Sequence, residues 1–196
     1  KLNLMVKLIG LKKIKTAVFI SGKGSNLRNL IKFSKIKKSP ISINLIISNT
    51  NKAAGLKYGN QNDIKKKVFD FQDIQITEKK ILEILDKNKI RFICLAGFMK
   101  ILSKNFINTF DGVIINIHPS LLPKYKGRNT HEKAIKNKDK FAGCTVHHVS
   151  KELDSGKIII QKKIKVVAKD NVASLTKKVL KLEHKLYPAA IMKIFS

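Results

Sequence analysis

Apolar residues recur along this chain with two spacings, one typical of strands and one typical of helices. Short apolar runs rich in β-branched residues predict buried strands. Such runs cover residues 16–20, 41–47, 68–71, 91–96, 113–117 and 144–149, and another begins at Ile158. Between them, apolar residues at every third or fourth position predict amphipathic helices. The predicted helices begin at Ser25, cover 52–60, 77–89 and 130–136 with Thr77 and Thr130 as N-caps, and run from Val172 to Pro188 at the end.

The order of these elements predicts the fold class. Strands and helices alternate up to residue 120, which predicts βαβ units on a parallel sheet. Beyond it, two strands joined by a turn at 153–156 predict a hairpin, which pairs antiparallel. We therefore expect an α/β protein with a Rossmann-like, open and mostly parallel sheet flanked by helices, and an antiparallel C-terminal extension. Residues 16–196 should form a single domain, and 1–15 a basic N-terminal extension.

The charge of the chain is strongly positive. Its formal net charge of +28 comes from 41 Lys and Arg residues against 13 acidic residues. Arginine occurs only at Arg28, Arg91 and Arg128, so nearly all basic residues are lysines. Proteins that read nucleic acids rely on arginine with interleaved aromatic residues, a pattern that this chain lacks. We expect a solvated basic surface that binds polyanions weakly at low salt, with a basic nucleic-acid-binding module as the alternative.

Hydropathy and cysteine content indicate the compartment. No apolar run reaches the ~18 residues that span a bilayer, so we expect a soluble, cytoplasmic protein. The two cysteines, Cys94 and Cys144, lie inside strand-like apolar runs. We expect both to be buried, because they have neither the spacing of metal ligands nor that of a disulfide framework.

The predicted strand at 113–117 carries two polar side chains at its end, Asn116 and His118. Residues two apart in an extended chain point to the same side, so an amide and an imidazole leave the strand together. In open α/β sheets, ligands bind at the carboxyl ends of strands. The pair suits a reaction that builds negative charge on a carbonyl oxygen, with Asn as donor and His as donor or proton carrier. The alternative is a strand-end histidine that hydrogen-bonds only to backbone.

A glycine-containing turn joins the first predicted strand to the first predicted helix. Residues 21–26 read Ser-Gly-Lys-Gly-Ser-Asn. Such a turn aims backbone N–H groups and the positive end of the helix dipole at an anion. The third glycine of the dinucleotide fingerprint is missing, which favours a single phosphate over a dinucleotide. The alternative is a tight turn with an ordinary N-cap.

Two other segments have both an ordinary and a functional interpretation. Asp154 lies in the turn at 153–156, where Asp is common for its turn chemistry alone. The apolar loop at 99–102, which precedes the predicted N-cap Ser103, is either ordinary core or the wall of a pocket for a flat heterocycle.

Taken together, the motifs resemble those of the folate-dependent phosphoribosylglycinamide formyltransferase family. The matching segments are 20–27, 48–49 with 54–56, 95–102, 116–123, 126–127, 143–147, 152–156 and 183–184. They occur in the family's order and at compatible spacing over most of the chain. The resemblance implies that the amine of glycinamide ribonucleotide attacks the formyl carbon of 10-formyltetrahydrofolate, in purine biosynthesis.

The resemblance also implies a role for each polar residue. Asn116 and His118 would stabilise the tetrahedral oxyanion, with His118 as the proton donor. Asp154 would hold His118 and a water in place and favour the imidazolium. No metal is implied.

Binding regions follow in the same way. Residues 16–120 would bind the ribonucleotide, and 121–196 would bind folate and close the fold. The residues implied for the ribonucleotide are Gly24, Ser25 and Asn26 at the phosphate, and Glu183 at a polar part of that substrate. The residues implied for formylfolate, the co-substrate, are Met99, Lys100, Ile101, Leu102, Asn116, Ser150, Lys151, Glu152, Leu153 and Asp154. We expect small-molecule substrates, no specific nucleic acid, no membrane, and a monomer or homodimer.

This chain also departs from its relatives. Residues 73–80 contain no arginine, although relatives often have one there that touches a substrate, and Lys100 stands where arginine is frequent. Two other enzyme types share the Asn-x-His…Asp set and remain alternatives. Formyltetrahydrofolate deformylase lacks the phosphate loop seen at 22–26. Methionyl-tRNA formyltransferase usually has Arg-Gly-x-x-Pro after Leu-Leu-Pro, whereas residues 126–130 here contain no proline.

Overall fold

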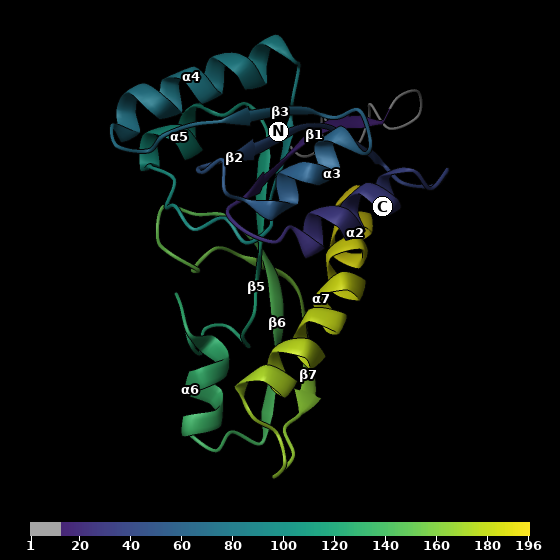
Figure 1. Ribbon diagram of the computed structural model, residues 1–196, viewed down its shortest axis with the longest axis vertical. Coiled ribbons are helices and arrows are strands. Elements are labelled where there is room, and N and C mark those ends of the chain that lie inside the picture. Colours follow the sequence, from purple (N-terminus) through teal and green to yellow (C-terminus); the bar gives the residue numbers. More distant parts are fainter. Residues whose placement is uncertain (1–12) are drawn as a thin grey trace. The chain divides into compact units, whose positions relative to one another are not determined.

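A computed structural model describes residues 13–196 and is shown in Figure 1. The strands are β1 Ile14–Ile20, β2 Ile41–Ser48, β3 Lys65–Val68, β4 Phe92–Leu95, β5 Val113–His118, β6 Phe141–His148 and β7 Ile158–Lys165. The helices are α2 Ser25–Ser34, α3 Lys57–Asn60, α4 Ile74–Lys87, α5 Lys104–Thr109, α6 Thr130–Lys136 and α7 Val172–Phe195, with a short 3₁₀ helix, η1, at Ala54–Leu56.

The strands form one mixed sheet in the order β3-β2-β1-β4-β5-β6-β7. β1 pairs in parallel with both β2 and β4, and β2 pairs in parallel with β3. β6 and β7 pair antiparallel, as the predicted hairpin requires. The predicted fold class is therefore confirmed: an open, mostly parallel sheet with helices and an antiparallel C-terminal extension.

The chain divides into two compact units. Its described residues 13–115 with 195–196 form the first unit, and 116–194 form the second, so the division falls inside β5. A single domain over 16–196 stays a prediction. The predicted N-terminal extension mostly covers residues 1–12, which lie outside the described residues. Its last residue is part of β1, which begins at Ile14.

The core of the first unit lies around β1. Residues 16–20 of this strand are fully buried, because helices cover both faces of it. Figure 1 shows α2 and α3 on one side of the parallel strands and α4 and α5 on the other. Right-handed crossovers require this arrangement, because the strand order reverses at β1. The Phe19 ring makes edge contacts with Phe98 and with Phe106 of α5, at centroid distances of 5.3 and 6.4 Å.

The predicted strand at 68–71 is wrong. The third strand is β3, Lys65–Val68, which pairs with β2 at the edge of the sheet. Its sequence is Lys-Lys-Lys-Val, and an exposed edge strand of this kind has no apolar alternation to reveal it. Phe71, which suggested a strand, is instead buried in the following loop and makes an edge contact with Phe98.

Three predicted helix ends also need correction. Helix α4 begins at Ile74, and the carboxylate of its N-cap, Asp73, accepts a hydrogen bond of 3.0 Å from the backbone N–H of Ile76. Thr77 lies inside this helix. Helix α6 has Asn129 as its N-cap, so Thr130 is its first residue. The third correction is at the C-terminus, where α7 continues through Pro188 to Phe195.

Helix α7 packs into the second unit through the apolar residues that the sequence predicted to be buried. Leu175, Val179, Leu182 and Leu186 of that helix are all buried. Cys144 on β6 and Cys94 on β4 of the first unit are both buried, as predicted, and neither is part of a disulfide. Within residues 13–196, no helix is both long enough and apolar enough to cross a membrane.

Candidate active site

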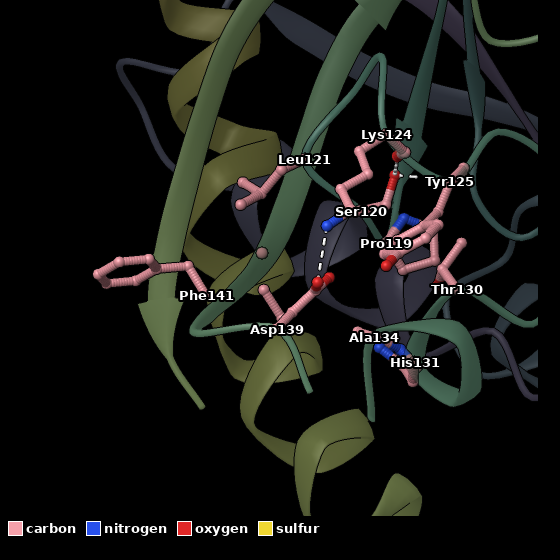
Figure 2. Close-up of a pocket in the computed structure, with 12 residues that line it drawn as sticks. Pro119, Ser120, Leu121, Lys124, Tyr125, Thr130, His131, Ala134, Asp139 and Phe141 are labelled. Atoms are coloured by element: carbon pink, nitrogen blue, oxygen red, sulfur yellow. Dashed lines mark hydrogen bonds and ion pairs between the residues drawn. The ribbon is translucent and has the colours of Figure 1, made fainter. Parts of the chain in front are cut away.

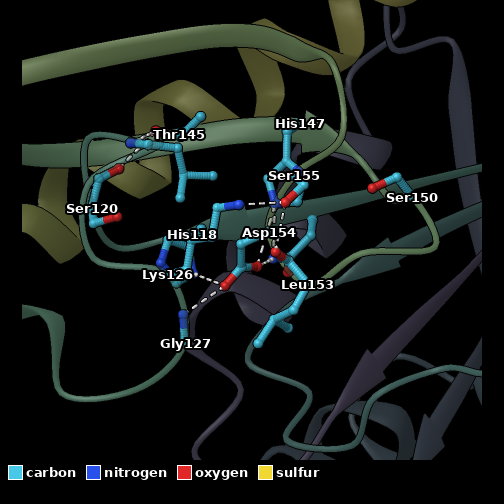
Figure 3. Close-up of polar contacts among 12 residues, drawn as sticks. His118, Ser120, Lys126, Gly127, Thr145, His147, Ser150, Leu153, Asp154 and Ser155 are labelled. Carbon is cyan, nitrogen blue, oxygen red and sulfur yellow. Dashed lines mark hydrogen bonds and ion pairs between the residues drawn. The ribbon is translucent and has the colours of Figure 1, made fainter.

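Four polar side chains meet in the second unit and form what we call the active-site cluster: Asn116, His118, His147 and Asp154. Figure 3 labels the two histidines and Asp154. The end of β5 supplies Asn116 and His118. The neighbouring strand β6 supplies His147, and the turn between β6 and β7 supplies Asp154. The structure thus brings together all three residues predicted from the sequence to do chemistry, and adds a second imidazole.

Asp154 is the centre of this cluster. One carboxylate oxygen accepts a hydrogen bond of 2.8 Å from the backbone N–H of Gly127 and lies 3.4 Å from Nδ1 of His118. The other oxygen lies 3.5 Å from Nδ2 of Asn116 and 3.7 Å from Nε2 of His147. The backbone of Asp154 has a φ of 49°, a left-handed turn conformation that Asp tolerates. Asp154 is therefore a turn residue whose carboxylate nevertheless faces His118.

The environment of Asp154 lowers the pKa of its carboxyl group. Burial alone acts in the opposite direction and would raise this pKa. The imidazoles of His147 and His118 and the hydrogen bond from the Gly127 backbone N–H outweigh the burial. Asp154 is consequently held as a carboxylate inside the cluster, with only 6% of its side chain exposed.

The imidazole of His118 lies between two oxygen acceptors. Its Nε2 is 2.9 Å from the backbone carbonyl of Tyr125, and its Nδ1 faces the Asp154 carboxylate. A carbonyl can only accept, so Nε2 carries a hydrogen and donates it. A hydrogen on Nδ1 would let this nitrogen donate to the Asp154 carboxylate, 3.4 Å away. The interpretation of His118 as a histidine bonded only to backbone is too simple, because one of its nitrogens meets a side-chain carboxylate.

His147 was missed as a functional residue at the sequence level, although it ends one of the matching segments. Its Nδ1 is 2.9 Å from the carbonyl of His148, and its Nε2 is 3.2 Å from Nδ2 of Asn116. Only 3% of its side chain is exposed. A usable signal was its position at the end of an alternating strand, where a buried polar side chain needs partners.

Hydrogen bonds within the loop after β5 position the backbone carbonyl that contacts the active-site cluster. The Ser120 hydroxyl donates a hydrogen bond of 2.7 Å to the Lys124 carbonyl, and the Thr145 hydroxyl donates one of 2.7 Å to the Ser120 carbonyl. These bonds fold the loop back so that the Tyr125 carbonyl reaches His118. At the far end of the loop, Lys126 donates to the Ser155 hydroxyl next to Asp154 (Figure 3).

A small hollow lies beside this loop in the second unit (Figure 2). Lys124 and Asp139 form an ion pair of 2.6 Å at its wall, which raises the pKa of Lys124. His131 also lines the hollow. Burial first, and then the charge of His118, lowers the pKa of His131. No residue of the active-site cluster lines this hollow, so it is separate from the predicted chemistry.

The remaining residues predicted for the second unit have mixed surroundings. Leu153 is half exposed beside Asp154, and the Ser150 hydroxyl donates to the Glu152 carbonyl within the same loop. Glu183 on α7 is buried. Burial and then the charge of Glu183 raise the pKa of the Cys144 thiol to about 12, so this thiol stays protonated.

In the first unit, the glycine turn after β1 has an unusual backbone. Gly24 is the N-cap of α2 with a φ of 70°, and a Cβ built on it would lie 2.6 Å from the Cα of Gly55. Gly55 in turn donates a backbone hydrogen bond of 2.9 Å to the carbonyl of Gly22. The first turn of α2 contains no acidic side chain, so none repels an anion there. Ser25 is half-buried and Asn26 buried at the start of this helix.

The loop at 99–102 is anchored to the same turn. The backbone N–H of Met99 donates a hydrogen bond of 2.8 Å to the Ser21 hydroxyl, which itself donates to Oδ1 of Asn49 at 2.5 Å. Met99 and Ile101 are exposed by 54% and 66%, whereas Leu102 is buried. The ordinary-core interpretation therefore holds for Leu102 and is wrong for the other two apolar residues. Ser103 caps α5 as predicted, since its hydroxyl accepts from the Phe106 N–H at 3.0 Å.

Comparisons with known proteins agree on one family. The family model described as formyl transferase matches residues 14–191. Phosphoribosylglycinamide formyltransferase of Escherichia coli (strain K12) is 38% identical over 177 residues, which are 89% of this chain and 84% of that protein. The crystal structure of phosphoribosylglycinamide formyltransferase from Brucella melitensis superimposes with a TM-score of 0.89 at 40% identity, covering 94% of this chain and 97% of that one.

Longer relatives match as well. The human trifunctional purine biosynthetic protein adenosine-3 is 40% identical over 188 residues, or 94% of this chain. The chain spans only 19% of the length of that trifunctional relative. The family model, the single-function relatives and their structures cover nearly all of this chain. The chain therefore belongs to the formyl transferase family, among its phosphoribosylglycinamide formyltransferases.

Proposed function

We propose that this protein transfers the formyl group of 10-formyltetrahydrofolate to the amine of 5-phosphoribosylglycinamide, a step of de novo purine biosynthesis. One observation carries the proposal: a single carboxylate, that of Asp154, faces both the imidazole of His118 and the amide of Asn116, at 3.4 and 3.5 Å. Family membership identifies the group that is transferred, and this geometry suits the transfer of an acyl group.

The chemistry needs charge stabilisation and proton transfer. The amine nitrogen forms a bond to the formyl carbon, and the carbonyl electron pair moves to oxygen. Asn116 donates a hydrogen bond to this oxyanion, and the His118 ring supports it with its positive charge. The oxyanion then re-forms the carbonyl as the bond from carbon to the folate nitrogen breaks. That nitrogen receives a proton through His118 while the attacking amine loses one. Asp154 orients His118, and its negative charge favours the imidazolium that forms during proton transfer.

Binding is assigned to loops of both units. Gly24, Ser25 and Asn26 would hold the phosphate. Helix α2 supports this assignment, because its N-cap is a glycine with no capping side chain and its first turn contains no acidic residue. Glu183 would contact a polar part of the same substrate. Met99 to Leu102, Asn116 and Ser150 to Asp154 would contact formylfolate. Exposed apolar side chains at Met99, Ile101 and Leu153 support the assignment of a flat heterocycle to these loops.

We infer further that the enzyme works in the cytoplasm as a monomer or homodimer on small molecules. Two buried cysteines outside any disulfide suit a reducing compartment. The proposed reaction needs no metal, because its acid, its oxyanion donor and its carboxylate are all side chains of the chain.

The experiment is a spectrophotometric assay of formylfolate consumption with and without glycinamide ribonucleotide. The proposal predicts turnover only when the ribonucleotide is present, with equal amounts of formylated ribonucleotide and tetrahydrofolate as products. Turnover without the ribonucleotide, with release of formate, would identify a deformylase instead. Formylation of methionyl-tRNA would identify the other enzyme of this fold. Tight binding of an oligonucleotide at physiological salt, with base preference and no turnover, would favour the nucleic-acid-binding module.

A further inference from the structure

His147 is the one member of the active-site cluster for which the proposed chemistry gives no task. It is nearly fully buried and lies next to Asn116, the proposed oxyanion donor. A buried imidazole must satisfy both ring nitrogens, and the two partners here differ in kind. One partner is the backbone carbonyl of His148, and the other is the side-chain amide nitrogen of Asn116.

These partners determine which tautomer the ring adopts. The His148 carbonyl only accepts, and it lies 2.9 Å from Nδ1, so Nδ1 carries the hydrogen. In the neutral ring Nε2 is then a bare acceptor. It faces Nδ2 of Asn116 at 3.2 Å, which suits an N–H···N hydrogen bond donated by the amide, whereas the Asp154 carboxylate lies 3.7 Å away, beyond hydrogen-bond distance. The second nitrogen of His147 therefore acts as a fixed acceptor.

This acceptor determines which way the Asn116 amide points. A side-chain amide can rotate to exchange its oxygen and nitrogen. With the nitrogen in place, Nδ2 faces two acceptors, Nε2 of His147 and a carboxylate oxygen of Asp154. After an exchange, the amide oxygen would face the same two acceptors with no hydrogen between them. The observed orientation is therefore strongly preferred.

One amide hydrogen stays available in this arrangement. The 3.2 Å contact to His147 uses one of the two hydrogens on Nδ2. The contact to Asp154 is 3.5 Å, longer than the ~2.9 Å of a good N–H···O hydrogen bond, so the second hydrogen is only loosely held. An oxyanion that forms close to Asn116 can replace the Asp154 carboxylate as the acceptor of this hydrogen.

We infer that His147, in its neutral Nδ1–H tautomer, is a positioning residue that orients the Asn116 amide so that an N–H, rather than the amide oxygen, is presented to the developing oxyanion. This inference rests on the proposed function of Asn116. His147 touches no reacting atom and acts only through Asn116. Its effect should fall on kcat, because an oxyanion donor acts in the transition state and contributes little to substrate binding.

Two substitutions test the two ring nitrogens separately, because each one keeps the hydrogen bond of one nitrogen and removes that of the other. Asn at position 147 can place an amide N–H where Nδ1 was, so His147→Asn keeps the bond to the His148 carbonyl and removes the acceptor. Gln at this position can reach with its amide oxygen to where Nε2 was, so His147→Gln keeps the acceptor for Asn116. His147→Ala removes both. The packing loss grows from Gln to Asn to Ala, so the comparison of each variant's kcat is read together with its KM values.

We expect kcat of His147→Asn and His147→Ala to fall on the order of tenfold or more, a part of the 10²–10³ that one oxyanion donor contributes. His147→Gln should recover most of this loss, and KM for both substrates should stay near wild type in all three variants. Equal kcat values for the Asn and Gln variants, or losses that appear mainly in KM, would overturn the inference.

A measurement on the wild-type protein tests the same inference without relying on activity. ¹⁵N NMR distinguishes the two neutral tautomers of each of the 5 histidines, and the spectrum of His147→Gln assigns the signal of His147. We expect a protonated Nδ1 and an unprotonated Nε2; the opposite tautomer would overturn the inference. If the tautomer is as expected but formyl transfer is absent, the proposed function fails and the tautomer result stands.

Discussion

The glycine turn of the first unit and the active-site cluster of the second are built from different parts of the chain. In the turn, the useful groups are backbone N–H groups, and their positions follow from Gly24 in a left-handed conformation at the start of α2. In the cluster, the useful groups are side chains from two strands and a turn, held by one carboxylate. A backbone site is sensitive to the conformation and size of a residue, whereas a side-chain site is sensitive to charge and hydrogen-bonding type.

The largest expected effect comes from removing the charge of a side chain in the active-site cluster while keeping its shape. Asp154→Asn keeps a residue that tolerates the left-handed turn but removes the negative charge facing His118. We expect kcat to fall by roughly 10²–10⁴, or about 3 to 5 kcal/mol of barrier, with both KM values nearly unchanged and only a small drop in melting temperature.

The control is a double-mutant cycle with His118→Asn. The single change should be comparably damaging, and the double variant should be much less damaging than the sum, since the two residues act as a unit. A kcat of Asp154→Asn within about twofold of wild type would leave turn chemistry as the whole role of Asp154.

The second largest effect comes from adding an uncharged side chain in the glycine turn, which changes the shape of the turn and leaves its charge unchanged. Gly24→Val forces a β-branched residue into a φ of 70° and places its Cβ against the Cα of Gly55. We expect the affinity for glycinamide ribonucleotide, measured by calorimetry, to fall about tenfold or more, since the left-handed conformation alone costs ~1–2 kcal/mol. Binding of formylfolate should be kept.

Gly22→Ala is the matched control for this change, because it lies in the same turn and a Cβ there meets nothing within 4 Å. It should bind the ribonucleotide like wild type. If Gly24→Val also binds it like wild type, the turn does not hold the phosphate.

A smaller effect concerns stability at acidic pH. The pKa of Asp154 is lower in the folded protein than in the unfolded chain, whose ordinary Asp value is ~3.9. The ionised carboxylate therefore stabilises the fold above about pH 4, and this contribution is lost as the pH falls through the lower, folded pKa. Urea unfolding of wild type and Asp154→Asn should show a constant difference near neutral pH that shrinks below about pH 4. A difference that grows with acidification would contradict the lowered pKa.

The smallest expected effect concerns the anchor of the loop at 99–102. Ser21→Ala removes the hydroxyl that joins the Met99 N–H to Asn49. We expect KM for formylfolate to rise a few-fold and stability to fall by about 1 kcal/mol, the usual value of one hydrogen bond, with kcat unchanged. Ser34→Ala, which removes a hydroxyl bonded to the Ile31 carbonyl at the end of α2, is the control and should leave this KM unchanged.

The sequence by itself predicted the elements whose signals are local. β5 was visible from its apolar run, and the side-by-side placement of Asn116 and His118 followed from the two-residue period of a strand. The glycine-containing turn before α2 was also predicted, because glycine favours tight turns by itself, while the left-handed conformation of Gly24 came from the structure. The order of strands and helices was sufficient for the fold class.

The tertiary structure decided what depends on partners far along the chain. β3 is a lysine-rich strand only because β2 offers it an edge, and α7 continues through Pro188 although proline removes a helical hydrogen bond. The pairing of Asp154 with His118, and the place of His147 beside Asn116, come from strand neighbours and a turn that meet only in the folded chain. Periodicity reports which face of an element is buried, but the hydrogen-bonding partner of a buried polar group is set by the element packed against it.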